Sequence, residues 1–261
     1  MKNKILKIVS FALMCAMMSS VLVRAESTAY SWSTPRNGNK QPIFPREAEL
    51  ITEHGGYYID KRHTDDTDEK VLYLTFDAGY ENGNIERILN VMKQKDVRGA
   101  FFVLDHLIID NTELVKRMKS EGHMVCNHTK SHKDLTKCTD GQIAEDLAAL
   151  EKICEEKAGF SLDKYFRFPE GKYSISALKC VNALGYKTVF WSFGYADWDN
   201  NKQPGTEYAM RKILDNTHNG EVILLHPTSA TNAEILPSLI DAWRAMGFRF
   251  GTLDELTTDR K

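Results

Sequence analysis

The stretch that decides the fold is Val71-Leu72-Tyr73-Leu74-Thr75-Phe76, which runs directly into Asp77-Ala78-Gly79-Tyr80. Its apolar, aromatic and β-branched residues are typical of a strand that is buried on both faces. A carboxylate next to such a run is costly unless it has a partner or a function. We therefore predict a buried strand with a candidate functional carboxylate, Asp77, at its carboxyl end; the alternative role for Asp77 is a helix N-cap.

Strand-like and helix-like segments alternate from this strand to the end of the chain. The alternation predicts an α/β fold in which helices cover a parallel sheet, and about seven βα units in one domain favour a closed or distorted (β/α) barrel over an open sheet. The predicted strands are 71–76, 99–103, 123–127, 165–168, 186–192, 222–225 and 248–251, and the predicted helices are 84–94, 111–120, 140–157, 174–184, 206–217 and 232–246.

The N-terminus has the composition of a secretory signal peptide. Three lysines precede an apolar run over residues 8–23, and Val23-Arg24-Ala25 offers small residues for cleavage. We predict that residues 1–25 are a signal peptide and that the protein is exported to the extracytoplasmic, cell-wall side of the membrane. The alternatives are a retained anchor, for which the run is shorter than the ~20 residues of a spanning helix, and lipidation of Cys15, which lacks a small residue before it.

The remainder of the chain is mildly acidic. The whole sequence has 34 Lys and Arg against 36 Asp and Glu, and four of the basic residues lie within residues 1–25, which leaves 30 against 36. This balance excludes the basic surface expected of a nucleic-acid binder. Residues 26–68 are polar and rich in turn residues, so we predict a leader that packs on the barrel domain of residues 69–261.

Four cysteines remain beyond Cys15: Cys126, Cys138, Cys154 and Cys180. An even number in an exported protein permits disulfides. Their spacing matches no Cys-x-x-Cys metal pattern, and two of the four fall in predicted helices, so buried thiols are the alternative.

Polar residues follow five of the predicted strands. In a (β/α) barrel the carboxyl ends of the strands meet at one face, where active sites lie, so we expect these residues to gather there. His128 and His132 are four residues apart and are candidate metal ligands, with two surface histidines as the alternative. The segments are Thr-Phe-Asp-Ala-Gly (75–79), His-Thr-Lys-Ser-His (128–132), Arg-Phe-Pro-Glu-Gly (167–171), Asp-Trp (197–198) and Leu-Leu-His (224–226).

In this order and spacing, the five segments resemble the five motifs of the polysaccharide deacetylases of the NodB-homology type, also called carbohydrate esterase family 4. The resemblance extends over roughly residues 71–256. It implies a distorted (β/α) barrel, in agreement with the alternation of segments, and a hydrolase that cleaves the amide bond of N-acetylated sugars.

The resemblance implies that Asp77 is the general base and that Arg167 orients it. Read from the residues alone, Arg167 has a structural ion pair as an alternative role. By the same resemblance, His226 is the general acid and Asp197 pairs with it. A base and an acid of this kind are what amide hydrolysis requires.

The resemblance also implies that His128 and His132 bind a divalent metal ion of the Zn, Co or Mn class. Most members of the family have a second Asp directly after the base as a third metal ligand, but this chain has Ala78 there. Because a methyl group cannot coordinate, we predict that the metal is weakly bound.

For substrate contacts, the resemblance assigns the backbone N–H of Glu170 to the oxyanion, and Trp198 and Leu224 to the pocket for the acetyl methyl group. The departure at Ala78, followed by Gly79-Tyr80-Glu81-Asn82, resembles the subgroup of delta-lactam-forming muramic acid deacetylases. By that resemblance the substrate is N-acetylmuramic acid in the glycan strand of peptidoglycan, after an N-acetylmuramoyl-L-alanine amidase has removed the stem peptide. The product leads to muramic δ-lactam in spore cortex.

Two alternatives to this function stay open from the sequence. One is deacetylation of N-acetylglucosamine in peptidoglycan or in another glycan. The other is a non-catalytic cell-wall binding module that has lost the metal through Ala78. A chain that had drifted away from catalysis would have no reason to keep Asp77 and His226 together, so we favour the enzyme.

Overall fold

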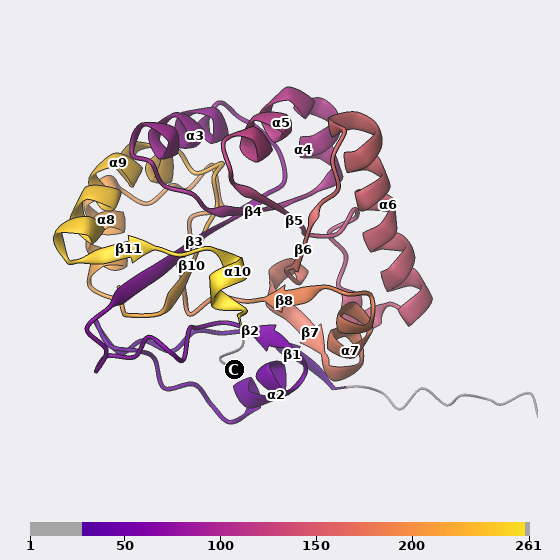
Figure 1. Ribbon diagram of the computed structural model, residues 1–261, viewed down its shortest axis with the longest axis horizontal. Helices are drawn as coiled ribbons and strands as arrows, with labels where there is room; N and C mark the ends of the chain where they lie inside the picture. The colour runs from indigo at the N-terminus through magenta and orange to yellow at the C-terminus, as the bar shows by residue number, and fades with distance from the viewer. Residues whose placement is uncertain (1–27, 259–261) are drawn as a thin grey trace, which may run out of the picture.

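A curled sheet of parallel strands with helices around it forms the centre of the protein (Figure 1). The computed structural model describes residues 28–258, so the predicted signal peptide and Cys15 lie outside the described residues. The order of the nine strands is β2 (Gly56–Tyr57), β8 (Lys187–Val189), β6 (Asp163–Phe166), β5 (Met124–Asn127), β4 (Ala100–Val103), β3 (Lys70–Ala78), β10 (Glu221–Leu225) and β9 (Phe193–Gly194), with β11 (Phe248–Phe250) beside the start of β3.

The two ends of this order are brought together by one short piece of chain. β8 lies near one edge and β9 at the other, yet only the residues 190–192 separate them. Within this piece, the Phe190 N–H donates to the Tyr57 carbonyl at 2.7 Å, and the Ser192 N–H donates to the Val222 carbonyl at 2.9 Å. The sheet is therefore curled into the distorted barrel that the sequence predicted.

All seven predicted strands and all six predicted helices are present. The helices are α3 (Asn84–Gln94), α5 (Thr112–Ser120), α6 (Asp140–Ala158), α7 (Ile175–Ala183), α8 (Thr206–Leu214) and α9 (Ala230–Ala245). The elements that the sequence analysis did not predict are short: β1 (Ala29–Ser31), α2 (Glu47–Glu53), β2, α4 (Asp105–Asp110), η1 (Leu135–Lys137), η2 (Pro169–Gly171), β7 (Lys172–Ser174), β9 and α10 (Leu253–Leu256).

The central strand, β3, is buried on both faces, as its composition predicted. Leu72, Leu74, Phe76 and Ala78 belong to the apolar layer between the sheet and the helices, together with side chains of α3 and α9. Val71 and Tyr73 alternate with them and pack against Ala100, Phe102 and Cys126 of the neighbouring strands. Asp77 shares the second face with Val71 and Tyr73, because successive side chains of a strand point to opposite faces.

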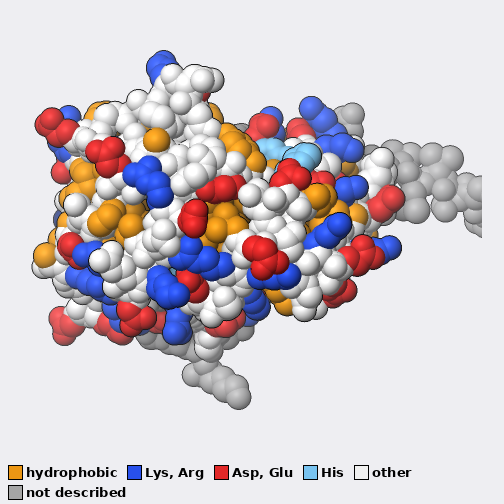
Figure 2. Space-filling model, turned by 90° about the horizontal axis from the view of Figure 1, so that it is seen from above, with side chains coloured by type: hydrophobic (Ala, Val, Ile, Leu, Met, Phe, Trp, Pro, Cys, Tyr) orange, Lys and Arg blue, Asp and Glu red, His pale blue; other side chains and the backbone are white. Residues whose placement is uncertain are grey.

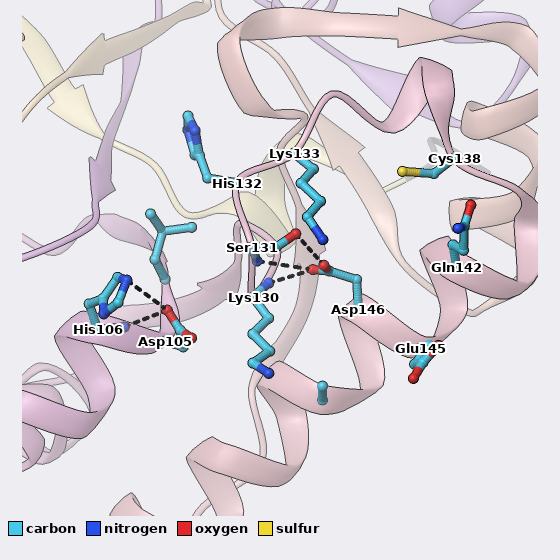
Figure 3. Close-up of a pocket in the computed structure, with 12 residues that line it drawn as sticks. Asp105, His106, Lys130, Ser131, His132, Lys133, Cys138, Gln142, Glu145 and Asp146 are labelled. Atoms are coloured by element: carbon cyan, nitrogen blue, oxygen red, sulfur yellow. Dashed lines mark hydrogen bonds and ion pairs between the residues drawn. The ribbon is translucent and has the colours of Figure 1, made fainter.

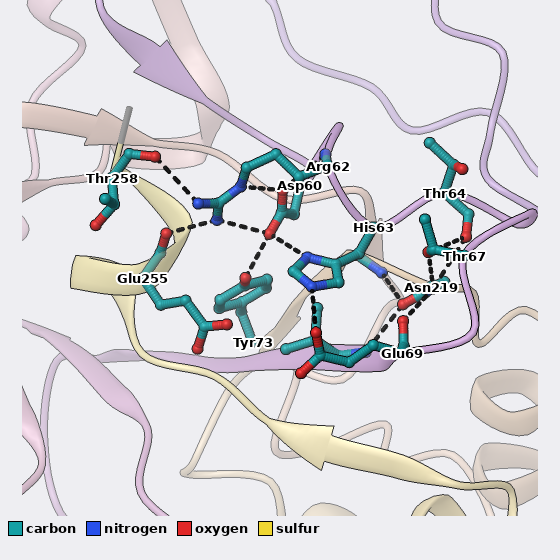
Figure 4. Close-up of polar contacts among 12 residues, drawn as sticks. Asp60, Arg62, His63, Thr64, Thr67, Glu69, Tyr73, Asn219, Glu255 and Thr258 are labelled. Carbon is teal, nitrogen blue, oxygen red and sulfur yellow. Dashed lines mark hydrogen bonds and ion pairs between the residues drawn. The ribbon is translucent and has the colours of Figure 1, made fainter. Parts of the chain in front are cut away.

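A cluster of charged and polar groups joins the N-terminal segment to the start of β3 (Figure 4). The Asp60 side chain, which is 1% exposed, accepts hydrogen bonds from Arg62, from Nδ1 of His63 and from the Tyr73 hydroxyl. Arg62 also donates to the backbone carbonyl of Glu255 in α10 and to that of Thr258. The cluster therefore ties the segment between β2 and β3 to the last residues that the structure describes.

The cysteines support the thiol alternative of the sequence analysis. Cys126, Cys154 and Cys180 are not in disulfides, and the first two are buried. Burial raises the pKa of the Cys154 thiol to about 12. Such a thiol stays protonated and unreactive at physiological pH.

The surface seen in Figure 2 carries Lys and Arg side chains interspersed with Asp and Glu, without a large patch of one sign. Among residues 28–258, no helix combines the length and the apolar composition needed to cross a membrane.

Candidate active site

The polar residues that follow the predicted strands come together around one cavity of about 670 Å³. Arg167 and Asp197 are fully buried and bond to Asp77 and His226, respectively. The predicted site residues that line the cavity itself are Asp77, His128, His132, Glu170, Trp198, Leu224 and His226.

The candidate base is held by a buried arginine. Nη1 of Arg167 donates to Oδ1 of Asp77 at 2.9 Å, and the other guanidinium nitrogens donate to the Val189 carbonyl and to Oγ1 of Thr75, both at 2.9 Å. Burial alone would raise the pKa of Asp77, but the charge of Arg167, together with its hydrogen bond and the charge of His226, outweighs burial and the pKa is lowered. Asp77 is therefore an ionised carboxylate that can accept a proton from water.

The candidate acid is paired with a carboxylate that has no contact with solvent. Nδ1 of His226 lies 2.7 Å from Oδ1 of Asp197, and the His226 backbone N–H donates to Oδ2 at 2.8 Å. Asn232 Nδ2 donates to the same Oδ2 at 2.6 Å. Burial alone would lower the pKa of His226, but the charge of Asp197 and its hydrogen bond outweigh burial and raise it. The imidazolium form, which can donate a proton, is therefore favoured.

The two candidate metal ligands form a pair of imidazoles whose ring centroids are 5.0 Å apart. His128 Nδ1 lies 2.9 Å from the Arg167 carbonyl, and burial lowers the pKa of His128 to about 4, so the ring is neutral at neutral pH. A neutral ring that donates through Nδ1 has a lone pair at Nε2, and this atom faces Oδ2 of Asp77 at 3.6 Å. A backbone acceptor behind one ring nitrogen and a free lone pair on the other is the usual arrangement of a metal-ligating histidine.

Ala78 adds no metal ligand to the two histidines. It is fully buried in the apolar layer behind β3 and does not line the cavity. Within the part of the chain that the structure describes, no group of three or more His, Cys, Asp or Glu residues is arranged to hold a metal ion. The residues present fit an ion that His128 and His132 hold, with the other coordination positions left to water and substrate.

The loops that carry these residues have strained backbones. Thr129, His132 and Glu170 have positive φ angles of 73°, 50° and 55°, which non-glycine residues adopt rarely and mainly at functional sites. Asp146 of α6 holds the first loop, because its carboxylate accepts hydrogen bonds from the backbone N–H groups of residues 130–131, at 2.7 and 3.3 Å. Nothing in the local sequence predicts this role, since Asp146 has the pattern of an ordinary polar residue of an amphipathic helix.

The side of the cavity assigned to substrate is partly apolar. Trp198 is 60% exposed, and its ring centroid lies 5.9 Å from that of His226, while Leu224 is almost buried beside it on the cavity wall. The Glu170 carboxylate forms an ion pair with Lys172 at 2.6 Å. This pairing leaves the backbone of Glu170 as the part of the residue that is suited to contact a substrate oxygen.

Asp197→Asn is expected to move the alkaline limit of activity to lower pH. His226 acts as an acid only below its pKa, and the pKa is raised mainly by Asp197, so removing the charge lowers it. The measurement is kcat as a function of pH, together with the titration of His226 by NMR. Asp199→Asn, two residues away and facing the Asn201 backbone, is the control. An unchanged alkaline limit in Asp197→Asn would show that His226 is not the acid.

Comparison with known proteins agrees with the fold. Residues 64–189 match the family described as polysaccharide deacetylase. The chain is 37% identical over 233 residues to the peptidoglycan-N-acetylmuramic acid deacetylase PdaA of Bacillus subtilis, covering 88% of this chain and 87% of that protein. It is 31% identical over 197 residues to a peptidoglycan-N-acetylglucosamine deacetylase of Bacillus cereus, covering 72% of this chain and 88% of that protein.

Solved structures give the same result. The structure of Bacillus subtilis PdaA, a family 4 carbohydrate esterase, superposes with a TM-score of 0.81 and covers 87% of this chain and 96% of its own. A family 4 carbohydrate esterase from Bacillus anthracis is 35% identical with a TM-score of 0.71, covering 88% of this chain and 96% of its own. With this similarity over most of its length, the chain belongs to the polysaccharide deacetylases of carbohydrate esterase family 4, hydrolases that cleave N-acetyl amide bonds.

Proposed function

We propose that the protein is an exported peptidoglycan deacetylase that removes the acetyl group from N-acetylmuramic acid. The observation that carries this proposal is one cavity in which an ionised carboxylate held by a buried arginine and an imidazole held by a buried carboxylate both reach the surface. The muramic acid specificity is supported by the 37% identity to a deacetylase of that substrate.

The reaction follows from the protonation states of the two residues. Asp77 takes a proton from a water molecule as the water oxygen attacks the carbonyl carbon of the acetamide. We assign to the backbone N–H of Glu170 the stabilisation of the negative charge that develops on the carbonyl oxygen. His226 then gives its proton to the nitrogen as the carbon–nitrogen bond breaks, which releases acetate and leaves a free amine on the sugar.

Deacetylases of this family are metal-dependent in general. In this chain His128 and His132 would hold the ion, which when bound lowers the pKa of water and polarises the acetamide carbonyl. Because only two imidazoles are available, we propose that the ion is weakly bound.

His132→Ala is expected to abolish zinc binding while leaving the protein folded. The His132 ring is exposed, so its removal costs little packing, but it is one of only two protein ligands. Isothermal titration of chelator-stripped protein with zinc measures the affinity, and thermal unfolding reports the fold. His106→Ala, which removes another exposed histidine, is the control. Equal zinc affinity in His132→Ala and the parent protein would contradict the assigned ligands.

Incubation of the protein with peptidoglycan glycan strands tests the function itself. The strands are first stripped of stem peptides with an N-acetylmuramoyl-L-alanine amidase, which is the reaction that we propose acts before this one. Mass spectrometry is expected to show a loss of about 42 Da per acetyl group at muramic acid, dependent on added metal. Subsequent loss of water from the same unit would mark conversion to the δ-lactam of spore cortex.

The other outcomes separate the alternatives. Loss of the acetyl group at glucosamine instead of muramic acid would replace the proposed substrate with N-acetylglucosamine. Release of acetate from no glycan, with metal supplied, would favour a binding module. Export is tested separately by locating the protein after cell fractionation, since residues 1–25 lie outside the described residues.

A further inference from the structure

The turn that carries Glu170 is the second strained loop of the site, and its support differs from that of the first. Figure 3 shows the first loop, after β5, bonded to the carboxylate of Asp146 in α6. In the second, Glu170 and Gly171 both have positive φ angles, 55° and 66°, and the Gly171 N–H closes the turn on the Phe168 carbonyl at 3.1 Å. A non-glycine residue such as Glu170 keeps this conformation only where the surrounding structure holds it.

The surrounding structure at this turn is the N-terminal segment. β7 follows the turn directly, and among residues 28–258 it pairs only with β1, in an antiparallel pair that is separate from the barrel sheet. The rings of Tyr30 and Tyr173 stack across this pair with their centroids 5.3 Å apart. Directly after β1, the backbone N–H of Trp32 donates to the Gly171 carbonyl at 2.9 Å. The turn is therefore fixed from its carboxyl side by residues that precede the barrel domain.

The Trp32 side chain holds a second part of the site. Its indole Nε1 donates to the Trp191 carbonyl at 2.8 Å, and the Trp191 side chain lines the active-site cavity. The carbonyls of the two residues before it, Val189 and Phe190, accept hydrogen bonds from the Arg167 guanidinium at 2.9 and 3.2 Å. The backbone that positions the arginine of the base is thus continuous with the backbone that Trp32 holds.

Close packing couples Trp32 to both parts of the site. Trp32 is only 9% exposed. A Cβ atom on Gly171 would come within 3.0 Å of both Trp32 and Trp191, so the turn lies directly between these two side chains. The Trp32 ring packs against three further rings at centroid distances of 5.0–5.2 Å, those of Phe44, Tyr58 and Phe190. Interiors packed this closely transmit a displacement to their neighbours.

We propose that Trp32 is a positioning residue for deacetylation, which fixes the Glu170 turn through its backbone N–H and the segment that binds Arg167 through its indole N–H. Trp32 is not among the described residues that line the cavity, so it acts through these neighbours and not on the substrate. The proposal rests on the proposed function in that it takes the Glu170 N–H and the Arg167-bound carboxylate to act in catalysis. The leader is then a working part of the active site.

Trp32→Phe in the full chain tests this role, because phenylalanine keeps an aromatic ring in the packing but has no indole N–H. We expect kcat for acetate release from peptide-free glycan strands, with metal at saturation, to fall about three- to tenfold, the effect of one hydrogen bond. KM should stay at the parental value, since the loss concerns the orientation of the reacting groups.

Trp243→Phe is the matched control. Trp243 is also fully buried, and its indole Nε1 donates to Oγ1 of Thr217 at 2.9 Å, but it is not among the described residues that line the cavity. This variant loses the same kind of hydrogen bond from the core and should keep the parental kcat. Thermal unfolding of both variants shows whether their losses of stability are comparable.

Amide hydrogen exchange is measured in parallel, because it needs no turnover. Trp32→Phe is expected to exchange faster over residues 169–174 and 190–192, and Trp243→Phe to keep the parental rates there. A parental kcat in Trp32→Phe, or an equal loss of kcat in both variants, would overturn the proposal. If the parent protein releases no acetate, the proposed function fails. Faster exchange confined to Trp32→Phe would then still establish that Trp32 holds the turn, and equal exchange in both variants would overturn this proposal too.

Discussion

Asp77→Asn is expected to lower kcat/KM for deacetylation by about 10²–10⁴-fold, the usual contribution of a general base. The amide oxygen of Asn can still accept the hydrogen bond from Arg167, but it cannot take a proton from water. Acetate release from peptide-free glycan strands, with metal at saturation, measures the effect. Thermal unfolding is followed alongside, because the substitution also leaves the buried Arg167 charge without its counter-ion.

Asp110→Asn, at the end of α4, provides the control for loss of an acidic charge near the barrel. Full activity of Asp77→Asn would mean that another group is the base. A loss of activity with an unfolded protein would be uninformative on its own, so Asp77→Glu is included. Glutamate keeps the charge opposite Arg167 but moves the carboxylate by one methylene, and its activity is expected to lie between those of Asn and Asp.

The largest effect on stability is expected from Asp60→Ala, which should lower the free energy of unfolding by about 3–5 kcal/mol. The Asp60 carboxylate is buried and is bonded to Arg62, His63 and Tyr73. Its removal leaves a guanidinium and a hydroxyl without their acceptor, so the cost exceeds that of a surface ion pair. Urea unfolding measures the change, and Asp68→Ala, an exposed residue in the same segment, should stay within about 0.5 kcal/mol of the parent.

The ionisation of Asp60 also makes the stability of the protein depend on pH. Burial alone would raise the pKa of Asp60, but its hydrogen bonds to Arg62 and Tyr73 outweigh burial and hold the pKa well below its usual range. The ionised form therefore contributes stability that is fully present above the unfolded pKa of about 3.9 and is lost as the pH falls below it. We expect stability to fall less steeply below about pH 4 in Asp60→Ala than in the parent protein. Equal slopes would show that the cluster does not carry this dependence.

Most of the barrel was predictable because each of its main elements has a local signature. Strand β3 was found from a run that is apolar on both faces, and it extends beyond the predicted residues 71–76 at both ends. Helix α3 was found from its helical period, and its predicted bounds, 84–94, are those observed. The end of β8 was not predicted correctly, because the apolar run over residues 186–192 continues past the three residues that form the strand. Its last residues leave the strand to reach β10, and that crossing depends on distant partners.

The residues of the site likewise fall into those that could be predicted from the sequence and those that could not. The residues at the carboxyl ends of strands were predicted to meet because the barrel requires it, and they line the cavity or bond to residues that do. Asn232 and Asp146, which hold Asp197 and the histidine loop, were not predicted. Each lies in a helix, where Asn or Asp suggests a cap or a solvated face, and nothing in the local sequence reports a partner that is far away along the chain. The burial of Ala78 was not predicted either, although it follows from the alternation of side chains along β3 once Asp77 faces the cavity.

The pairing of β3 with strands from the far end of the chain has a consequence for folding. Leu72 lies opposite both Glu221 of β10 and Phe250 of β11, so the central strand is completed only by residues that are synthesised last. Contacts of such long sequence separation fold slowly and leave apolar strands unpaired in the meantime. Until β10 and β11 are available, the backbone groups of the run from Val71 to Phe76 lack their partners and can pair with another chain, which leads to aggregation. We expect a chain that ends before Glu221, and so lacks both strands, to accumulate as insoluble protein.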